Sequence, residues 1–331
     1  MKTKFNLTLI VVLALVLTVQ TGFSQKLTLY RNLSFDPGNE AKVSAISPDE
    51  KLIICGFASG AIKAYDTHSG ELKYKSDRHK GDIHSIEFSP DGKYFLTTSQ
   101  DKLAILWRTE NGKILKNYSG HTEAVWTGVF SPNMNYILTA GGDNVIKVWE
   151  SVSTNQYRHI WGHTDRIYDI DVTPDGKYVV SASRDRSIRI WDYKKKLEIK
   201  VLKGHAHIVR TLDVSNDGKY ILSGSKDNSI KLWDIATGAN LKTYRVNHWH
   251  VLSVAFSSDD KYFVSSHWDN TFILWKKDSA TPLIQNQDHT GPVSNVVFSK
   301  SSRFIVSCST QSVKIWETGL SLVDTASSEE K

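Results

Sequence analysis

Histidine, aspartate, serine and tryptophan recur at regular intervals along this chain of 331 residues, and the first three are the residue types of a serine hydrolase. The recurring set comprises His79, His121, His163, His205, His248 and His289, with Asp101, Asp143, Asp185, Asp227 and Asp269, and with Trp107, Trp149, Trp191, Trp233, Trp275 and Trp316. A catalytic triad needs one exposed group of such side chains, whereas this group is repeated along the chain. Repetition favours a structural role, and we assign no catalytic residue.

The aromatic residue that closes each unit sets the period of the repeat. Tyr65 is followed after 42 residues by Trp107, and the same step leads to every later tryptophan of the set except Trp316, which follows Trp275 after 41. Each histidine lies 14 or 15 residues after one of these aromatics, and each aspartate lies six before one. Three residue types that stay in phase over seven units indicate an internal repeat.

The pattern inside one unit is that of β-strands. Residues 167–172 alternate between apolar and polar side chains, and residues 178–183, 187–191 and 197–202 are three further short strands. Thr173-Pro174-Asp175-Gly176 predicts a hairpin turn between the first two. Four short antiparallel strands per unit, in seven units, predict an all-β fold: a seven-bladed β-propeller.

The units resemble WD repeats. Gly120-His121…Asp143…Trp149-Glu150 carries the resemblance, as do the units around His163 and His205, and it extends from Leu27 to Glu317. The departures are Tyr65 for tryptophan and Ser59 for aspartate in unit one, Asn247-His248 and Asp288-His289 in units six and seven, and one residue lost near Thr310-Gln311. These end units should form the less regular blades.

The resemblance implies a hydrogen-bonded set of histidine, turn aspartate, strand serine and tryptophan within each blade. On this interpretation Ser99, Ser183 and Ser225 occupy the strand position, while Gly141 and His267 replace the serine. A buried indole or imidazole N–H needs a hydrogen-bond partner, so such a set is physically reasonable.

The first residues are those of a secretory signal. Lys2 and Lys4 precede an apolar run over residues 7–19, and small residues lead to an expected cleavage after Ser24. The run is shorter than the roughly 20 residues of a membrane span, although an uncleaved anchor is the alternative. We expect a signal peptide at 1–24, a propeller at 25–318 and a short disordered tail at 319–331, in a secreted or periplasmic, monomeric protein without stable membrane insertion.

The last blade needs a fourth strand from elsewhere in the chain. Residues 27–33 alternate like a strand and precede the first unit. We expect this segment to close the ring, with residues 320–323 as the competing candidate.

One face of the ring should carry the loop before the first strand and the loop between the second and third strands of each blade. We predict a partner-binding patch here, of His84, Trp126, Arg166, Tyr168, Arg184, Arg210, Lys226, His250 and Trp268. Aromatic and arginine side chains are concentrated in binding surfaces, which favours an acidic or sugar-bearing partner, foremost a protein. The alternative is a set of solvated loop residues with incidental aromatics.

Four carboxylates should point toward the central channel: Glu87, Asp169, Asp171 and Asp213. We expect solvated or paired channel residues rather than a cation site, because they lack the spacing of metal ligands. Three of them, Asp169, Asp171 and Asp213, are candidates for the alternative function, a propeller lyase or glycan hydrolase. No zinc signature, phosphate-binding glycine loop or nucleophile elbow occurs, and no cofactor is expected.

Composition limits the remaining possibilities. Forty per cent apolar residues suffice for a large core, which excludes wholesale disorder. A net charge of +6 without a block of basic residues disfavours a nucleic-acid partner. Cys55 and Cys308 should lie on neighbouring blades but point to opposite faces of their strands, so two buried free thiols are expected.

Overall fold

The computed structural model describes residues 27–36, 38–151, 156–246 and 249–320. The expected signal peptide with its cleavage site, the tail beyond Leu320 and His248 lie outside the described residues. Within these ranges no helix has the length and apolar character that a membrane crossing requires.

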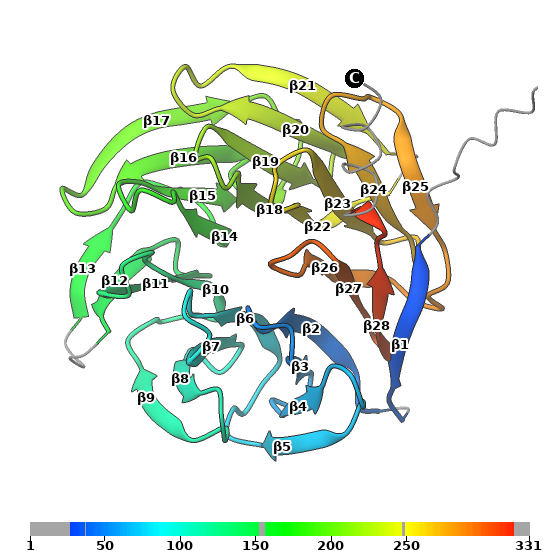
Figure 1. Ribbon diagram of the computed structural model, residues 1–331. Coiled ribbons are helices and arrows are strands. Elements are labelled where there is room, and N and C mark those ends of the chain that lie inside the picture. The colour runs from blue at the N-terminus through cyan, green and yellow to red at the C-terminus, as the bar shows by residue number, and fades with distance from the viewer. Residues whose placement is uncertain (1–26, 37, 152–155, 247–248, 321–331) are drawn as a thin grey trace, which may run out of the picture.

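The described residues form 28 strands in seven antiparallel sheets of four (Figure 1). Blade one contains β2 (Ala41–Ile46), β3 (Leu52–Phe57), β4 (Ile62–Asp66) and β5 (Leu72–Ser76); blade two β6 (Ile83–Phe88), β7 (Tyr94–Ser99), β8 (Ala104–Arg108) and β9 (Ile114–Tyr118); blade three β10 (Val125–Phe130), β11 (Tyr136–Gly141), β12 (Ile146–Glu150) and β13 (Gln156–Ile160); blade four β14 (Ile167–Val172), β15 (Val179–Ser183), β16 (Ser187–Asp192) and β17 (Leu197–Lys203).

Three further blades complete the ring, which confirms the prediction of a seven-bladed propeller. Blade five contains β18 (Val209–Val214), β19 (Tyr220–Ser225), β20 (Ser229–Asp234) and β21 (Asn240–Arg245); blade six β22 (Val251–Phe256), β23 (Tyr262–His267), β24 (Phe272–Lys276) and β25 (Pro282–Asn286); blade seven β26 (Val293–Phe298), β27 (Phe304–Ser309), β28 (Ser312–Glu317) and β1 (Thr28–Ser34). The first strand of each blade lies at the centre of the ring and the fourth at its perimeter (Figure 1).

The N-terminal strand closes the ring, as expected. β1 pairs antiparallel with β28, from Thr28 opposite Glu317 to Ser34 opposite Ser312. Leu33 within β1 and Leu27 just before it are both buried. Blade seven is thus built from both ends of the described chain.

The hydrophobic core lies between the blades. Seven clusters of buried residues are present, and each draws its members from two adjacent blades. Between blades three and four, for example, Leu138 and Val148 pack with Ile170 and Trp191. Both faces of every sheet are therefore covered, which explains why the strands that lie second in each blade are almost wholly buried.

Candidate functional site

The repeated histidines and tryptophans meet at a buried hydroxyl. In blade four, His163 Nε2 lies 2.7 Å from Ser181 Oγ, and Trp191 Nε1 donates to the same oxygen at 2.8 Å. His163 Nδ1 lies 2.8 Å from a carboxylate oxygen of Asp185. The same set occurs as His79, Asp101, Thr97 and Trp107; as His121, Asp143, Thr139 and Trp149; and as His205, Asp227, Ser223 and Trp233.

The hydroxyl in this set is not the one expected from the sequence. Ser183 instead donates to the carbonyl of Asp165 at 3.0 Å and accepts the backbone N–H of Asp185 at 3.1 Å. It lies two residues beyond Ser181, on the same face of the strand but at the end nearer the loops. Its hydroxyl therefore ties two loops together, and the residue that bridges histidine and tryptophan is Ser181.

Electrostatics agree with a structural role for the set. Burial lowers the pKa of His163, and the hydrogen bond to Asp185 only partly offsets this effect. Burial by itself would raise the pKa of Asp185, but the hydrogen bonds from His163 and Ser187 hold it well below its usual range. A neutral imidazole therefore donates to a charged carboxylate, and the His163 side chain is inaccessible to solvent.

The end blades depart from the set, as the sequence predicts. In blade six His267, on the strand, lies 2.9 Å from Ser265 Oγ, to which Trp275 donates. In blade seven the hydroxyl of Ser312 lies 3.3 Å from His289 Nδ1, where other blades place the aspartate. In blade one Cys55 lies opposite Lys63, in the register that Ser181 has opposite Arg189.

The two cysteines are free and buried, and both belong to the core between blades seven and one. They point to opposite faces of their own sheets, but the two blades are neighbours, and those faces are turned toward each other. Burial raises the pKa of both thiols, to about 12 for Cys308.

A β-bulge occurs near the start of the first strand in all seven blades. In blade four, Ile167 pairs with Ser183 and Asp169 with Ala182, so Tyr168 has no partner of its own. The residues at this bulge position are Lys42, His84, Trp126, Tyr168, Arg210, Leu252 and Ser294. Bulges redirect side chains. Five of these seven residues are large and polar or aromatic, and the other two are Leu252 and Ser294. In blade six the residue in this place is Leu252, which the sequence pattern does not single out.

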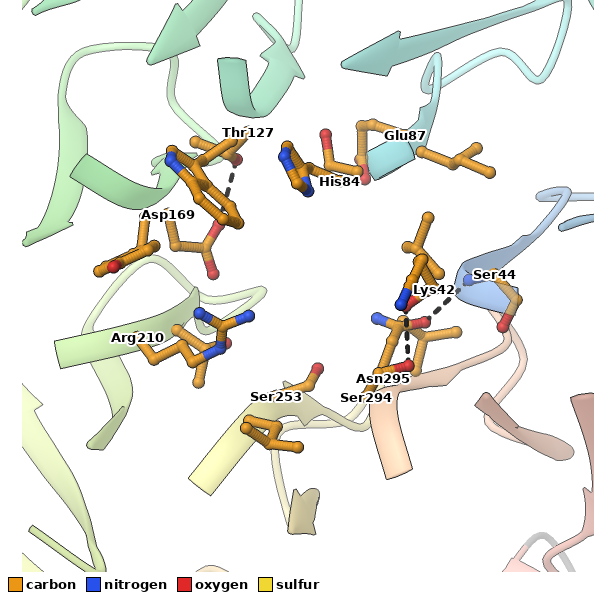
Figure 2. A pocket seen from close by; sticks show the side chains of 18 of the residues that line it. Lys42, Ser44, His84, Glu87, Thr127, Asp169, Arg210, Ser253, Ser294 and Asn295 are labelled. Atoms are coloured by element: carbon orange, nitrogen blue, oxygen red, sulfur yellow. Dashed lines mark hydrogen bonds between the residues drawn. The ribbon is translucent and has the colours of Figure 1, made fainter. Parts of the chain in front are cut away.

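The bulge residues surround a pocket of about 540 Å³ at the mouth of the central channel (Figure 2). We call this set the mouth ring. It lies on the face that carries the loop before each first strand and the turn between each second and third strand. These segments are joined by backbone hydrogen bonds, such as Arg184 N–H to Arg166 C=O at 2.9 Å. We call this face the top face.

Four of the seven mouth-ring residues form a continuous row of stacked side chains. The rings of His84 and Trp126 are stacked with centroids 4.0 Å apart, and Tyr168 meets Trp126 edge-on at 5.1 Å. The guanidinium of Arg210 lies over Tyr168 at 5.3 Å and over Trp126 at 5.8 Å. Burial lowers the pKa of His84, so this imidazole, the first ring of the row, is neutral at pH 7.

The structure separates the predicted partner-binding residues into two groups. His84, Trp126, Tyr168, Arg210 and Trp268 line the pocket. Arg166, Arg184, Lys226 and His250 lie on the surrounding loops, where Arg184 is 3.6 Å from Asp165 and His250 Nδ1 is 3.1 Å from the Lys226 carbonyl. The bulge that turns the pocket residues inward is a backbone feature that a pattern of residue types does not reveal.

The four predicted channel carboxylates also line the pocket, and three of them tie adjacent blades together. Their partners are backbone N–H groups on the first strand of the next blade. The pairs are Asp169 with Leu212 (2.9 Å), Asp171 with Val214 (2.9 Å) and Asp213 with Phe256 (2.6 Å). First strands have one unpaired edge, and these carboxylates satisfy part of it. Among the described residues no group of three His, Cys, Asp or Glu side chains is placed to hold a metal ion.

A closed ring of repeated four-stranded blades with a buried histidine–hydroxyl–tryptophan set defines a β-propeller built from sequence repeats. The WD domain, G-beta repeat model matches residues 70–108, 112–150, 154–192, 196–234, 238–276 and 281–317. The chain therefore belongs to the WD40 family. Each matched segment begins with the fourth strand of one blade and continues into the next, and the irregular first three strands of blade one are unmatched.

Curated relatives match over shorter stretches. Eukaryotic translation initiation factor 3 subunit I of Sclerotinia sclerotiorum is 37% identical over 70 residues, which is 20% of this chain and 21% of the relative. Serine-threonine kinase receptor-associated protein of Bos taurus is 30% identical over 76 residues, 23% of this chain and 22% of the relative. The chain thus matches about a fifth of the length of these relatives.

Proposed function

We propose that this chain is an exported, non-catalytic WD-repeat scaffold that binds a partner protein on its top face. The observation that carries the proposal is the mouth ring: a bulge in every blade turns seven side chains toward one pocket, and four of these form a row of aromatic and cationic groups. Aromatic and arginine side chains in a concave surface are typical of protein interfaces.

The exposed tryptophan beside the pocket extends this surface. Trp268 lines the pocket and is 54% exposed. Arg166 and Arg184 are exposed on the loops of blade four. A large apolar side chain that stays in water costs free energy, and a partner that covers it recovers that cost.

The absence of catalysis is part of the proposal. The histidine, aspartate and hydroxyl groups of the repeats are enclosed in the blades, and Asp169, Asp171 and Asp213 are held by backbone N–H groups. These hydrogen bonds explain why carboxylates stand at the three positions, and no substrate is needed to explain them.

Binding can be tested by capture with two matched variants. The top-face variant combines Arg166→Glu, Arg184→Glu and Trp268→Ala, and the control combines Lys93→Glu with Lys177→Glu at the exposed turns on the opposite face. Wild type and control should capture the same envelope proteins from the source organism, as quantified by mass spectrometry, and the top-face variant should lose them. Equal capture by all three would refute binding through this face.

Export is supported by the charged start, the apolar run and the small residues before position 25. Full-length chain expressed with its own leader should leave the cytosol, and the intact mass of the product should begin at Gln25. A product that keeps its first residues and fractionates with membranes would indicate the alternative, an uncleaved anchor.

A further inference from the structure

The guanidinium of Arg210 is a positive charge that has no carboxylate bound to it among the described residues. Arg210 is half-buried at the bulge of β18 and extends into the pocket (Figure 2). The ion pairs of the described residues do not include it, and none of their hydrogen bonds uses its side chain as donor. Asp169 is close enough to favour the charged guanidinium, but the two oxygens of Asp169 bind Thr127 and Leu212 instead.

The guanidinium lies against the aromatic row. Tyr168 and Trp126 contact it through their rings, and His84 is stacked behind Trp126. A guanidinium that lies against aromatic faces keeps its N–H groups directed outward in its own plane. The N–H of Trp126 is also buried without a hydrogen-bond partner among the described residues. The row therefore presents the N–H groups of the Arg210 guanidinium to the pocket, while the Trp126 N–H is enclosed.

Besides Arg210, the pocket is lined by Lys42 and by five carboxyl groups, those of Asp82, Glu87, Asp169, Asp171 and Asp213. Lys42 extends into the same pocket from blade one, although its ammonium is 2.8 Å from Glu40 (Figure 2). Enclosure in the channel and the neighbouring aspartates raise the pKa of Glu87 to about 8, and enclosure raises that of Asp169 to about 7. Glu87 and Asp169 thus carry less than their full negative charge at neutral pH, and Asp171, whose pKa burial raises to about 6, is bound to the backbone N–H of Val214 rather than to Arg210.

We propose that the mouth ring binds a carboxylate side chain from an acidic segment of the partner protein, with Arg210 as the group that pairs with it. This inference rests on the proposed function, because it concerns the same face. A carboxylate matches the two parallel N–H groups of a guanidinium and can pair with them bidentately.

Other ligands fit the pocket less well. A cationic side chain would meet Arg210 and Lys42, and the aromatic faces that could hold it are occupied by the guanidinium. A phosphate group carries about two negative charges and is usually held by several arginines, whereas the mouth ring has one. The carboxyl groups below would repel a dianion more than a monoanion.

The test uses a random dodecapeptide library displayed on phage and selected on the immobilised chain from Gln25 to Lys331. Selected sequences should be enriched in Asp and Glu relative to the library. One such peptide is then synthesised in three forms: as selected, with Asn and Gln for its acids, and with phosphoserine for its acids. Each form is titrated by fluorescence anisotropy against wild type, Arg210→Gln, Arg210→Lys and Arg108→Gln, after matching melting temperatures show that all four are folded.

We expect Arg210→Gln to weaken the selected peptide about tenfold or more, the scale of a lost charge-assisted hydrogen bond. Arg210→Lys should recover part of the affinity, and Arg108→Gln, which removes an exposed guanidinium at the end of β8 on the opposite face, should stay within about twofold. The amide form should bind as weakly to wild type as the selected peptide binds to Arg210→Gln.

The outcomes separate this inference from the proposed function. Selected sequences without acids, an amide form that binds as well, a phosphoserine form that binds much more tightly, or equal losses in Arg210→Gln and Arg108→Gln would overturn the carboxylate site while leaving a peptide-binding face. If selection enriches no sequence over a blank surface, the proposed function itself is contradicted.

Discussion

One hydroxyl per blade serves two buried nitrogens. Because His163 Nδ1 donates to Asp185, His163 Nε2 must be an acceptor, so the Ser181 hydroxyl donates to it and accepts from Trp191. Donor and acceptor capacity is thereby matched at a site from which water is excluded. The set thus satisfies the hydrogen-bonding groups of two buried polar rings, and no substrate is needed to explain it.

Removing this hydroxyl should be costly. In Ser181→Ala the N–H of Trp191 and the Nε2 of His163 both lose their partner while buried, and we expect a loss of about 2–4 kcal/mol in the free energy of unfolding. Ser181→Thr keeps the hydroxyl, as Thr97 and Thr139 do in blades two and three, and should cost much less. Urea unfolding measures both, and a loss below about 0.5 kcal/mol in Ser181→Ala would show that the set contributes little.

The carboxyl groups of the channel should make stability fall as pH rises. The pKa of Glu87 is raised from 4.5 to about 8, so the folded protein keeps a proton that the unfolded chain has lost. This contribution is fully present below pH 4.5 and is lost as pH rises through 8. The buried His267 and His289, with pKa values of about 4, oppose the trend only below about pH 6.5.

Glu87→Gln should therefore flatten the pH dependence between 6.5 and 8.5. Channel water reaches Glu87 and screens its charge, so we expect the loss of unfolding free energy over this interval to shrink by about 1 kcal/mol or less. The exposed Glu110→Gln is the control and should leave the dependence unchanged. If the unfolding free energies of wild type and Glu87→Gln depended on pH in the same way, Glu87 would not be the group that keeps the proton in the folded protein.

The sequence could identify which residue types are buried, but not every contact between them. The histidine, aspartate and tryptophan positions follow from their spacing, whereas Ser183 and Ser181 are both small, polar and on the same strand face. Only the distance from the indole decides between them. His267 is a similar case, since its position in the sequence marks a lost serine and the structure shows an imidazole bound to Ser265.

At the scale of the element, the bulge determines which side chains reach the pocket, and the closing strand β1 completes the ring. The strand pattern of residues 167–172 predicts β14 correctly, yet strict alternation would place Tyr168 on the face opposite Ile167 within a regular ladder. The bulge leaves Tyr168 unpaired and turns it toward the channel mouth. Bulges depend on local backbone geometry, so the composition of the mouth ring was predictable only in part.

The closing strand should be essential for stability. Deleting residues 25–34 removes the pairing of β1 with β28 and the packing of Leu33 against blade one, and leaves β28 as an open edge. We expect a melting temperature lower by at least about 5 °C, which corresponds to roughly 2 kcal/mol in a domain of this size. Leu29→Ala, at an exposed position of the same strand, is the control. An unchanged melt after deletion would favour closure by residues 320–323.

At the scale of the whole molecule, no blade has a hydrophobic core of its own. Each of the seven clusters joins two neighbours, and the core between blades six and seven also takes Leu27 from the N-terminal segment. An open array of repeats can lose its end units separately, because those have only one neighbour. A closed ring has no end unit, so the loss of any blade exposes two interfaces.

Unfolding should therefore be a single transition wherever the ring is weakened. Trp191→Ala in blade four and Trp316→Ala in blade seven each remove a buried indole from an interface between blades, and we expect each to cost about 3–5 kcal/mol. If the ring unfolds as one unit, both variants shift the same calorimetric peak, and the calorimetric and van't Hoff enthalpies agree. A second peak in Trp316→Ala alone would show that blade seven, assembled from β1 and the C-terminal strands, separates before the rest, and that the closing strand is a weaker link than the other blade contacts.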